Sequence, residues 1–414
     1  MSAPALARPR LVVAGCGFAG FALLRSLRSD RFDVTLVSPR NYFLFTPLLP
    51  SAATGTVEFR SIVEPARRRL RGVRVVEGSL AAVDWARRSV TGFAAIGGAE
   101  FELGFDHLVV AVGSETATFG VRGVEEHAIP FTALEHARSV RRRLLEQFAL
   151  ASVPGIAEAV VAEALTFVVC GGGPTGVEVA AEIHDLIVGE LATSFPEQTR
   201  RARVVLVEAG PRLLASFDGA LAEYTARHFR REGIEVRMQA PVAEVTPKGI
   251  VFASGEGIAS GLVVWAAGTQ PAAIVRALGV ELDGRGRIVV DSRFRVASRT
   301  GLWAIGDCAA IGDPPLPATA QVAQQQGAHL ARVLEAVASG REPRPFRFRS
   351  FGMLAYVGEH RALADLPGIK WSGRGAWLFW RSVYLTKLVS LSNKAKVLFD
   401  WIKARLFGRD LARF

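Results

Sequence analysis

The hydrophobic pattern contains the same unit twice. An apolar run, FVVC at residues 167–170, stops at three glycines and resumes with helical spacing as far as residue 183. The segment 11–20, LVVAGCGFAG, repeats this arrangement and leads into a helix expected over residues 21–27. Short continuous apolar runs are typical of buried strands, and apolar residues three and four positions apart indicate an amphipathic helix. Each unit is therefore predicted to fold as strand, turn and helix.

Both turns carry glycines in the spacing G-x-G-x-x-G: Gly15, Gly17, Gly20, Gly171, Gly173 and Gly176. In this pattern the first glycine makes a tight turn, the second lets the backbone approach a pyrophosphate, and the third lets the helix pack closely on the strand. The phosphates then lie at the N-terminus of the helix, where backbone N–H groups are unpaired. Because each motif lies between a predicted strand and a predicted helix, two dinucleotide-binding folds are expected.

The strand that follows each turn ends differently. Residues 203–208, RVVLVE, end at Glu208, whose carboxylate can accept hydrogen bonds from the ribose diol of an adenosine. Residues 33–37, DVTLV, are followed instead by Ser38, with Arg40 nearby. An arginine at this place accommodates a 2′-phosphate and favours NADP, whereas a neutral hydroxyl can hold an unphosphorylated ribose. The residues leave both interpretations of the first fold open.

Each fold continues into short apolar segments separated by turn residues, which predict an antiparallel meander. The two meanders lead to strands that end in small residues at Gly113 and Gly268. Such a strand end lets backbone lie against a cofactor. Because fold, meander and closing strand recur in the same order, the sequence indicates duplication of one nucleotide-binding unit.

Three further segments are candidates for chemistry. Residues 41–51, NYFLFTPLLPS, are predicted to form a buried loop that could wall a flat ring, because their prolines interrupt a regular helix. In residues 302–309, LWAIGDCA, Asp307 either caps the next segment or contacts a polyol or phosphate. Gln321 and Gln325 are four positions apart on one predicted helix face. Their amides could donate to a neutral carbonyl, or they could form a solvated polar face.

Composition limits the class of protein. The chain has 414 residues, enough for two or three domains, and half are hydrophobic, yet no apolar run reaches the roughly 18 residues of a spanning helix. No targeting segment is expected, because the first strand begins too soon after the N-terminus to leave room for one. Of the three cysteines, Cys16 and Cys170 adjoin a glycine of a predicted nucleotide loop, and Cys308 lies two residues after Gly306. We expect them to be reduced and chemically inert, and we expect no metal site.

The net charge of +11 is concentrated at the C-terminus. Residues 370–414 contain ten basic and two acidic side chains, a net +8, together with four of the seven tryptophans. Aromatic and leucine residues recur there with helical spacing: Trp377, Trp380, Tyr384, Leu388, Leu391, Leu398, Trp401, Ile402 and Leu406. A basic amphipathic segment with tryptophans is typical of helices that lie on an anionic membrane surface. The alternative is a pair of helices docked on the protein's own core or on a dimer partner.

Five segments together resemble the type II NADH:quinone oxidoreductases: GCGFAG, SPRNYFLFTPLLPS, GGGPTGVE, WAIGDCA and AQVAQQQG. These are single-subunit, non-pumping flavoenzymes of the superfamily with two dinucleotide-binding domains. The glycine motifs and WAIGDCA occur across that superfamily, whereas the proline loop, the glutamine helix and the basic aromatic tail are more specific. The resemblance covers the chain from about residue 11 to its end.

The resemblance implies an α/β fold with two Rossmann-like domains and a C-terminal amphipathic helical segment that binds the membrane. We expect an FAD-binding domain at residues 1–150 and 290–345, an NADH-binding domain at 151–289, and a membrane-association region at 346–414. Non-covalent FAD is expected at Gly15, Gly17, Phe18, Ala19, Gly20, Ser38, Arg40, Thr46, Pro47, Gly113, Gly306, Asp307 and Gln321. NADH is expected at Gly171, Gly173, Pro174, Thr175, Gly176, Glu178, Glu208 and Gly268.

The resemblance also implies the reaction, in which a hydride passes from NADH to FAD and two electrons then pass to a membrane quinone. Glu178 matches the family glutamate placed between nicotinamide, flavin and quinone, and Gln321 and Gln325 match quinone-contacting positions. Because the Glu208 carboxylate would repel a 2′-phosphate, we expect NADH to be preferred over NADPH. The expected location is the cytoplasmic face of a bacterial inner membrane, with a homodimer possible.

Three rival interpretations are less consistent with the residues. Sulfide:quinone oxidoreductases and disulfide reductases need redox cysteines near the flavin, and the three cysteines here fall in nucleotide loops. A soluble ferredoxin reductase would have no use for the amphipathic tail. A flavin-containing nucleic-acid-binding protein would use basic residues for phosphates, but here they are interleaved with tryptophan and leucine, so no nucleic acid is expected.

Overall fold

The computed structural model describes residues 8–412, and the chain folds into two compact units. Unit 1 contains the residues up to Leu44, with Glu64–Glu115 and Thr269–Ser350, and unit 2 contains Phe45–Val63, Thr116–Gly268 and the residues from Phe351 onward. Residues 1–7, part of the segment where no targeting signal is expected, lie outside the described residues. Each unit is an α/β fold, as expected.

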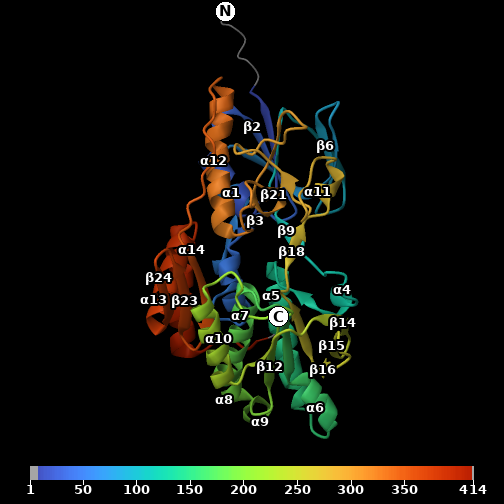
Figure 1. The fold of residues 1–414 in the computed structure, drawn as a ribbon, viewed down its shortest axis with the longest axis vertical. Coiled ribbons are helices and arrows are strands. Elements are labelled where there is room, and N and C mark those ends of the chain that lie inside the picture. Colours follow the sequence, from blue (N-terminus) through green and yellow to red (C-terminus); the bar gives the residue numbers. More distant parts are fainter. Residues whose placement is uncertain (1–7, 413–414) are drawn as a thin grey trace, which may run out of the picture. The chain divides into compact units, whose positions relative to one another are not determined.

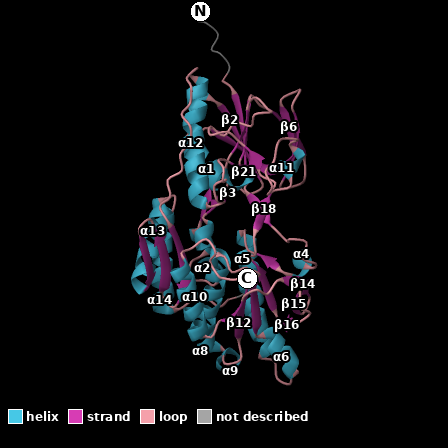
Figure 2. Ribbon diagram, viewed as in Figure 1, coloured by secondary structure: helices cyan, strands magenta, loops and turns pink. Residues whose placement is uncertain are grey.

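Unit 1 is built on a seven-stranded sheet in the order β20-β8-β1-β2-β5-β6-β7 (Figures 1 and 2). The parallel part comprises β1 (Arg10–Ala14), β2 (Asp33–Ser38), β5 (Val73–Asp84), β8 (His107–Val110) and β20 (Leu302–Ala304). β5 continues into the antiparallel strands β6 (Ser89–Ala94) and β7 (Glu100–Gly104), which is the predicted first meander. Continuous apolar runs such as LVVA suit the centre of this sheet, because a parallel strand is usually covered on both faces.

Two helices of unit 1 pack directly on each other, namely α1 (Phe18–Ser26) and α12 (Ala320–Ala338) (Figure 1). Their close approach requires a glycine, because a Cβ atom at Gly327 would lie 2.1 Å from the carbonyl oxygen of Ala19. The helix that carries the two candidate glutamines is thereby fixed against the helix of the first glycine turn.

Unit 2 contains a five-stranded parallel sheet in the order β10-β17-β11-β12-β13. Its strands are β10 (Ile129–Pro130), β11 (Thr166–Cys170), β12 (Arg203–Val207), β13 (Glu235–Arg237) and β17 (Leu262–Trp265). The predicted second meander forms a separate antiparallel sheet of β14 (Val242–Thr246), β15 (Gly249–Phe252) and β16 (Gly257–Ala259). One apolar cluster joins the two sheets, with Val168 and Trp265 from the first packed among Val245 and Ile250 from the second.

The main helices of unit 2 are α5 (Leu134–Ala151), α6 (Glu158–Ala164), α7 (Pro174–Leu186) and α10 (Gly219–Glu232). Helix α7 is the one predicted after the second glycine turn, whereas α6 was not predicted. The shorter elements of the chain are β3 (Tyr42–Leu44), α2 (Leu49–Ala53), β4 (Val63–Pro65), α3 (Ala66–Arg69), β9 (Ser114–Thr116), α4 (Val124–His127), α8 (Ala192–Ser194), α9 (Pro196–Thr199), β18 (Thr269–Pro271), α11 (Ile274–Ala277), β19 (Ile288–Val289) and β21 (Ala309–Ala310).

The C-terminal part of unit 2 begins with an antiparallel sheet that the sequence analysis missed, made of β22 (Met353–Gly358), β23 (Arg361–Leu366) and β24 (Ile369–Gly373). The expected helical pair follows as α13 (Arg374–Lys387) and α14 (Leu391–Phe407). β22 packs on α7, and α13 packs on β23. Among the described residues, no helix combines the length and hydropathy needed to cross a bilayer.

The unit boundaries differ from the expected domain boundaries at 150, 289 and 346. Helix α5 belongs to unit 2, because it packs on α2, α6 and β17. Residues 269–289 belong to unit 1, where β18 pairs with β9 and β19 pairs with β21. The C-terminal segment belongs to unit 2 as well, through its contacts with α7 and α10. These boundaries depend on pairings between distant segments, which local patterns do not contain.

Two local predictions also need correction. The first helix begins at Phe18 rather than residue 21, because Gly17 is its N-cap. The segment 41–51 is buried as expected, but it is not irregular throughout. It forms a 3₁₀ turn at Thr46–Leu48, and α2 then begins at Leu49. Pro50 is compatible with α2 because the first helical turn needs no backbone N–H from that residue.

Candidate active site

The first glycine turn of unit 1 has the steric features that a pyrophosphate cradle needs. Gly15 has φ +107°, and a Cβ atom there would lie 2.2 Å from the carbonyl oxygen of Ala111. A Cβ atom at Gly20 would lie 2.0 Å from the oxygen of Gly15, so both positions need glycine for packing. Gly17 instead faces open space and is the N-cap of α1, with no side chain capping the helix. The unpaired N–H groups at the start of α1 are therefore available to an anion.

The second glycine turn, in unit 2, repeats this geometry. Gly171 has φ +114°, and a Cβ atom there would lie 2.5 Å from the oxygen of Ala266. A Cβ atom at Gly176 would lie 1.8 Å from the oxygen of Gly171, while Gly173 faces open space. Gly173 is the uncapped N-cap of α7, and Pro174 occupies the first turn. The two units thus present two equivalent helix N-termini, as the repeated motif predicts.

Glu208 lies at the end of β12, beside the second glycine turn. Its two carboxylate oxygens accept hydrogen bonds from the backbone N–H groups of Gly172 and Gly210, each at 2.6 Å. Each oxygen of a carboxylate can accept a second bond. The side chain is therefore held in place with acceptor capacity left for a ribose diol.

The corresponding position in unit 1 is occupied by Ser38, whose side chain closes a turn. Its hydroxyl donates to the carbonyl oxygen of Arg40 at 2.9 Å and accepts from the Arg40 N–H at 3.3 Å. Ser38 is buried, whereas Arg40 is exposed. The hydroxyl thus shapes the chain after β2, and the exposed guanidinium is the more accessible of the two groups.

The segment after β20 is fixed by a buried glutamine that the sequence analysis did not select. Gln326 Oε1 accepts from the N–H of Gly306 at 2.6 Å. Gly306 has φ +79°, and a Cβ atom there would lie 3.0 Å from the Ala19 side chain. Asp307 follows and accepts from the Ser114 hydroxyl at 3.1 Å, while burial raises its pKa. The structure therefore brings Asp307 to the end of the first closing strand, next to Gly113.

The two candidate glutamines of α12 differ in their surroundings. Gln325 Nε2 donates to the carbonyl oxygen of Arg349 at 2.9 Å, and its Oε1 accepts from the Arg349 N–H at 3.1 Å. An amide nitrogen carries two N–H donors, so one donor of Gln325 remains after this pairing. Gln321 is half-buried, four positions earlier on the same helix. A quinone contact by either residue stays a prediction.

A row of three acids lies along one face of α7: Glu178, Glu182 and Asp185. Glu182 is buried and accepts hydrogen bonds from Ser51 (2.6 Å), Thr54 (2.7 Å) and Thr56 (3.1 Å). Arg409 lies 3.5 Å from the same carboxylate. Only Glu178 was selected from the sequence. The spacing of the other two acids was visible, but their partners lie far away in the chain.

Tyr356 of β22 joins the first and last of these acids. Its backbone N–H donates to Glu178 Oε1 at 3.0 Å, and its hydroxyl donates to Asp185 Oδ2 at 2.5 Å. Asp185 also accepts from the N–H of Glu359 at 3.1 Å. Glu178 is the least compensated of the three, because it is buried with this one backbone donor.

These surroundings leave Glu178 protonated near neutral pH. Burial is the main cause that raises its pKa to about 8, and the charge of Glu182 adds to the effect. Burial also raises the pKa of Asp185 to about 6. Tyr384 of α13 has its pKa raised well above the ordinary value, by burial and then by the charge of Glu178. An acid with a pKa near the operating pH is suited to giving and taking a proton.

The three cysteines have no role in this site. Cys16, Cys170 and Cys308 are buried and form no disulfide, and burial raises the pKa of each thiol to about 12. Redox cysteines need an accessible thiolate. The residues thus lack the chemistry of a disulfide or sulfide oxidoreductase.

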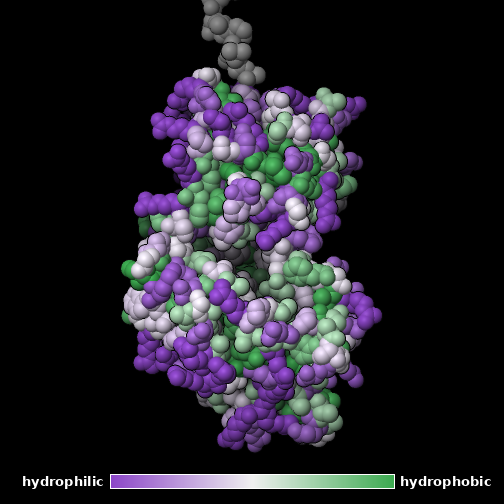
Figure 3. All heavy atoms as spheres, in the orientation of Figure 1, coloured by the Kyte–Doolittle hydropathy of each residue, from purple (hydrophilic) through white to green (hydrophobic). Residues whose placement is uncertain are grey.

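The C-terminal helices expose only part of the aromatic face expected to contact lipid. Trp380, Leu388 and Trp401 are 3–5% exposed and belong to the protein core, which corrects that expectation. The apolar side chains that remain exposed on these helices are Leu378, Leu391, Leu398, Phe399, Ile402, Leu406 and Phe407. Figure 3 shows apolar and polar side chains interleaved over this region. The buried tryptophans agree with the alternative of helices docked on the protein's own core, and lipid contact by the exposed side chains stays a prediction.

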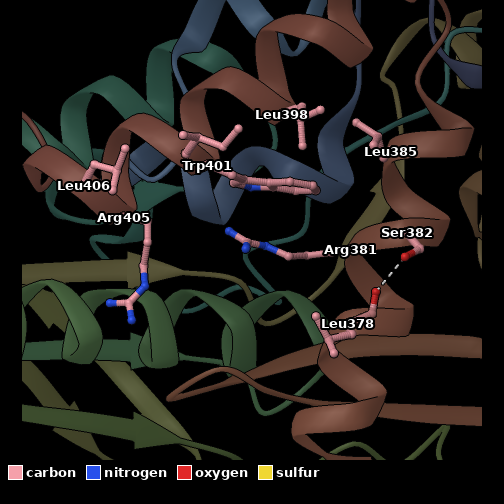
Figure 4. A pocket seen from close by; sticks show the side chains of 9 residues that line it. Leu378, Arg381, Ser382, Leu385, Leu398, Trp401, Arg405 and Leu406 are labelled. Carbon is pink, nitrogen blue, oxygen red and sulfur yellow. Dashed lines mark hydrogen bonds between the residues drawn. The ribbon is translucent and has the colours of Figure 1, made fainter.

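A cavity of about 370 Å³ lies between α13 and α14 (Figure 4). Its apolar lining includes Leu385 and Leu398, one from each helix. Arg381 lies beneath the Trp401 ring, with its guanidinium carbon 4.4 Å from that ring's centroid and 4.3 Å from the centroid of Trp377. Cation–π contacts of this kind hold the half-buried guanidinium in place.

Comparison with known proteins identifies relatives along the whole chain. A family model described as pyridine nucleotide-disulphide oxidoreductase matches residues 9–327, and one described as NDH2 C-terminal domain matches residues 351–410. The chain is 37% identical to a probable NADH dehydrogenase of Dictyostelium discoideum, over 98% of this chain and 91% of the relative. It is 35% identical to the mitochondrial internal alternative NAD(P)H-ubiquinone oxidoreductase A1 of Arabidopsis thaliana, over 98% and 86%.

Among solved structures, too, the chain is similar to an NADH dehydrogenase of this family. The structure of NDH2 from Plasmodium falciparum in complex with NADH matches with a TM-score of 0.92 and 25% identity, over 98% of this chain and 100% of that one. A sulfide:quinone oxidoreductase from Aquifex aeolicus matches with a TM-score of 0.72 at 19% identity. The second likeness concerns the fold alone.

The raised pKa of Glu178 predicts how stability depends on pH. Between pH 4.5 and about 8 the folded state keeps a proton that the unfolded state releases, so the free energy of unfolding falls as pH rises. The loss for one group is at most about 1.4 kcal/mol per pH unit. We expect Glu178→Gln to flatten this slope between roughly pH 6.5 and 8, as measured by urea denaturation.

Asp185→Asn is the matched control. Because the pKa of Asp185 is raised only to about 6, this variant should change the slope at lower pH and keep the wild-type slope above it. If the free energy of unfolding had the same pH dependence in wild type and Glu178→Gln between roughly pH 6.5 and 8, the raised pKa of Glu178 would be contradicted.

Proposed function

The chain belongs to the type II NADH dehydrogenases, and we propose that it passes a hydride from NADH to non-covalent FAD and two electrons onward to a membrane quinone. No proton pumping accompanies this reaction. One observation carries the proposal: a single chain presents two glycine turns with uncapped helix N-termini, each in its own α/β unit. Two bound dinucleotides are what a transfer from NADH to a flavin requires.

FAD is assigned to unit 1. The pyrophosphate would lie at the start of α1, over Gly15, Gly17, Phe18, Ala19 and Gly20. Asp307 and Gly306 would contact the cofactor from the segment after β20, near Gly113. The flavin, when bound, supplies the hydride-accepting and electron-transferring chemistry. Ser38, Arg40 and Gln321 complete the expected set in unit 1, and the family resemblance adds Thr46 and Pro47 for the ring system.

NADH is assigned to unit 2. Its pyrophosphate would lie at the start of α7, over Gly171, Gly173, Pro174, Thr175 and Gly176, with Gly268 at the end of the closing strand. Glu208, held by two backbone N–H groups, would accept from the adenosine ribose. Hydride transfer requires the nicotinamide and the acceptor atom to approach to about 3–3.5 Å. The protein's part is to hold both rings in that geometry.

Glu178 is assigned to proton handling and orientation. Reduction of a quinone to a quinol consumes two electrons and two protons. A buried carboxyl group that is protonated near neutral pH can give a proton and recover it from solvent. Gln321 and Gln325 are assigned to the quinone carbonyls, because amides donate hydrogen bonds without adding charge.

Residues 370–414 are assigned to peripheral binding on an anionic lipid surface. The exposed leucines and phenylalanines of α13 and α14 would enter the interface, and lysines such as Lys394 and Lys396 would face the headgroups. Each lysine or arginine near an anionic leaflet contributes about 1 kcal/mol. A homodimer and a bacterial inner-membrane location stay predictions.

The reaction itself is tested by spectroscopy and turnover. The purified protein, supplied with FAD, should be yellow and should bleach when NADH is added without oxygen. It should then oxidise NADH with a short-chain ubiquinone, and proteoliposomes should develop no proton gradient during turnover. A protein that takes up no flavin, or whose flavin NADH does not reduce, would contradict the proposal.

Cofactor preference is tested at Glu208. Two negative charges about 4 Å apart repel by about 4 kcal/mol at the effective dielectric near a protein surface, so wild type should prefer NADH over NADPH. Glu208→Gln should reduce the ratio of kcat/KM for the two cofactors by roughly tenfold or more. Glu235→Gln, which removes an acid from the neighbouring strand, should leave the ratio unchanged. Equal use of both cofactors by wild type would refute the assignment.

Lipid binding is tested by replacing exposed residues, because deleting residues 370–414 would also remove the buried Trp380 and Trp401. Leu398→Glu with Ile402→Glu should lower the fraction of protein that floats with phosphatidylglycerol vesicles several-fold. Ile96→Glu with Val153→Glu, two exposed apolar positions elsewhere, is the control. Turnover with a water-soluble quinone should be unchanged in both variants. Equal flotation of both double variants would count against this surface.

A further inference from the structure

Three groups that can bind metal ions meet outside the proposed catalytic residues, where α10 ends beside the turn between β22 and β23. His228 and Glu232 are one helical turn apart on α10, and Glu359 belongs to the turn. One ligand atom from each residue lies within 4.8 Å of the other two. All three residues belong to unit 2, as do both of the elements that carry them.

His228 is a buried imidazole beside the two carboxylates. Its side chain is 5% exposed, its Nε2 has no well-aligned hydrogen-bond partner among the described residues, and the backbone at Gly358 and Val357 acts on the ring. Its Nδ1 lies 3.6 Å from Glu232 Oε1, so the ring is directed at the cluster. Tyr224 stacks on the ring, with centroids 6.1 Å apart and 21° between the planes. The ring is thus held between aromatic and backbone neighbours, with Nδ1 facing the carboxylate of Glu232.

The imidazole is in the form that binds metals. Burial and then the charge of Arg361 lower its pKa, and the charge of Glu359 acts in the opposite direction. A neutral imidazole offers a nitrogen lone pair to a metal ion, whereas an imidazolium does not. The ring is therefore ready to act as a ligand without first losing a proton.

Glu232 and Glu359 form a carboxylate pair. Burial is the leading cause that raises the pKa of Glu232, followed by its hydrogen bond with Glu359. Two carboxylates this close either share a proton or bind a cation between them. A metal ion would replace that proton and take the third ligand atom from His228.

The charges around the cluster set the expected strength of binding. Arg361 Nε lies 3.9 Å from Glu359 Oε2, while its Nη1 donates to the Tyr224 hydroxyl at 3.4 Å. Arg231 also acts on Glu232 from the same helix. The positive charges of these arginines repel a divalent cation, so the affinity of the cluster for zinc should be below that of a structural zinc site. They also provide a test in which removing a charge strengthens binding.

We propose that His228, Glu232 and Glu359 bind one divalent transition-metal ion, Zn²⁺ by preference, and thereby hold the β22–β23 turn on α10. One imidazole and two carboxylates with a water as fourth ligand are a donor set that zinc accepts. Mg²⁺ and Ca²⁺ prefer ligand sets made of oxygen alone. The sequence predicts no metal here, because the third ligand is far from the other two in the chain.

The test is a calorimetric titration of the flavin-loaded, full-length protein with ZnCl₂. We expect one ion per chain with micromolar affinity, little competition from Mg²⁺, and a higher Tm when zinc is bound. Glu359→Gln should weaken binding by on the order of tenfold or more, comparable to the loss of other metal-site groups. Arg361→Gln should strengthen it. Glu223→Gln, which removes an acid of α10 outside the cluster, is the control and should change nothing.

A second measurement identifies the ligands. Because His228 is buried, His228→Gln could destabilise the fold, so X-ray absorption of zinc-loaded wild type is the independent readout. It should show nitrogen and oxygen neighbours at about 2.0–2.2 Å and no sulfur. Absence of zinc binding, equal affinity in Glu359→Gln, or weaker binding in Arg361→Gln would overturn the proposal. The outcome does not depend on whether the protein oxidises NADH.

Discussion

Burial of carboxylates along α7 is the constraint on which the structure of unit 2 depends. A charged or polar group away from water is expensive unless hydrogen bonds compensate for it. The compensation for Glu182 comes from Ser51, Thr54 and Thr56 at one end of the sequence and from Arg409 at the other. Satisfying this one side chain therefore fixes α2 and the C-terminal residues against the helix of the second glycine turn.

The three acids of this row differ in how many hydrogen-bond or ion-pair partners each one has. Glu182 has four partners, Asp185 has two donors, and Glu178 has a single backbone donor. The pKa follows this order in the two groups whose shift is resolved, about 6 for Asp185 and about 8 for Glu178. The least compensated acid is also the one placed in the first turns of α7, behind the glycines. Stability is thus given up at the position to which we assign the handling of a proton.

The C-terminal helices serve the core and the surface together. Trp380 and Trp401 fill the interior, while Leu398 and Ile402 remain exposed only a few residues away. A helix with three to four residues per turn can divide its apolar side chains between two directions in this way. Any role at a lipid surface is therefore coupled to the fold, because the helices that carry the exposed residues also close the core of unit 2.

The sequence alone determined the two strand–turn–helix units, the meanders and the long helices, because glycine spacing and hydrophobic periodicity act over a few neighbouring residues. It also predicted Glu208 from its place at the end of the strand after the second glycine turn, and Glu178 through the resemblance to a known family. Only the tertiary structure decided the partners of Glu182, the burial of Trp380 and the meeting of His228 with Glu359. The C-terminal sheet was missed for the same reason. These features depend on contacts between residues far apart in the chain, and a local pattern contains no record of which distant groups will share one buried space.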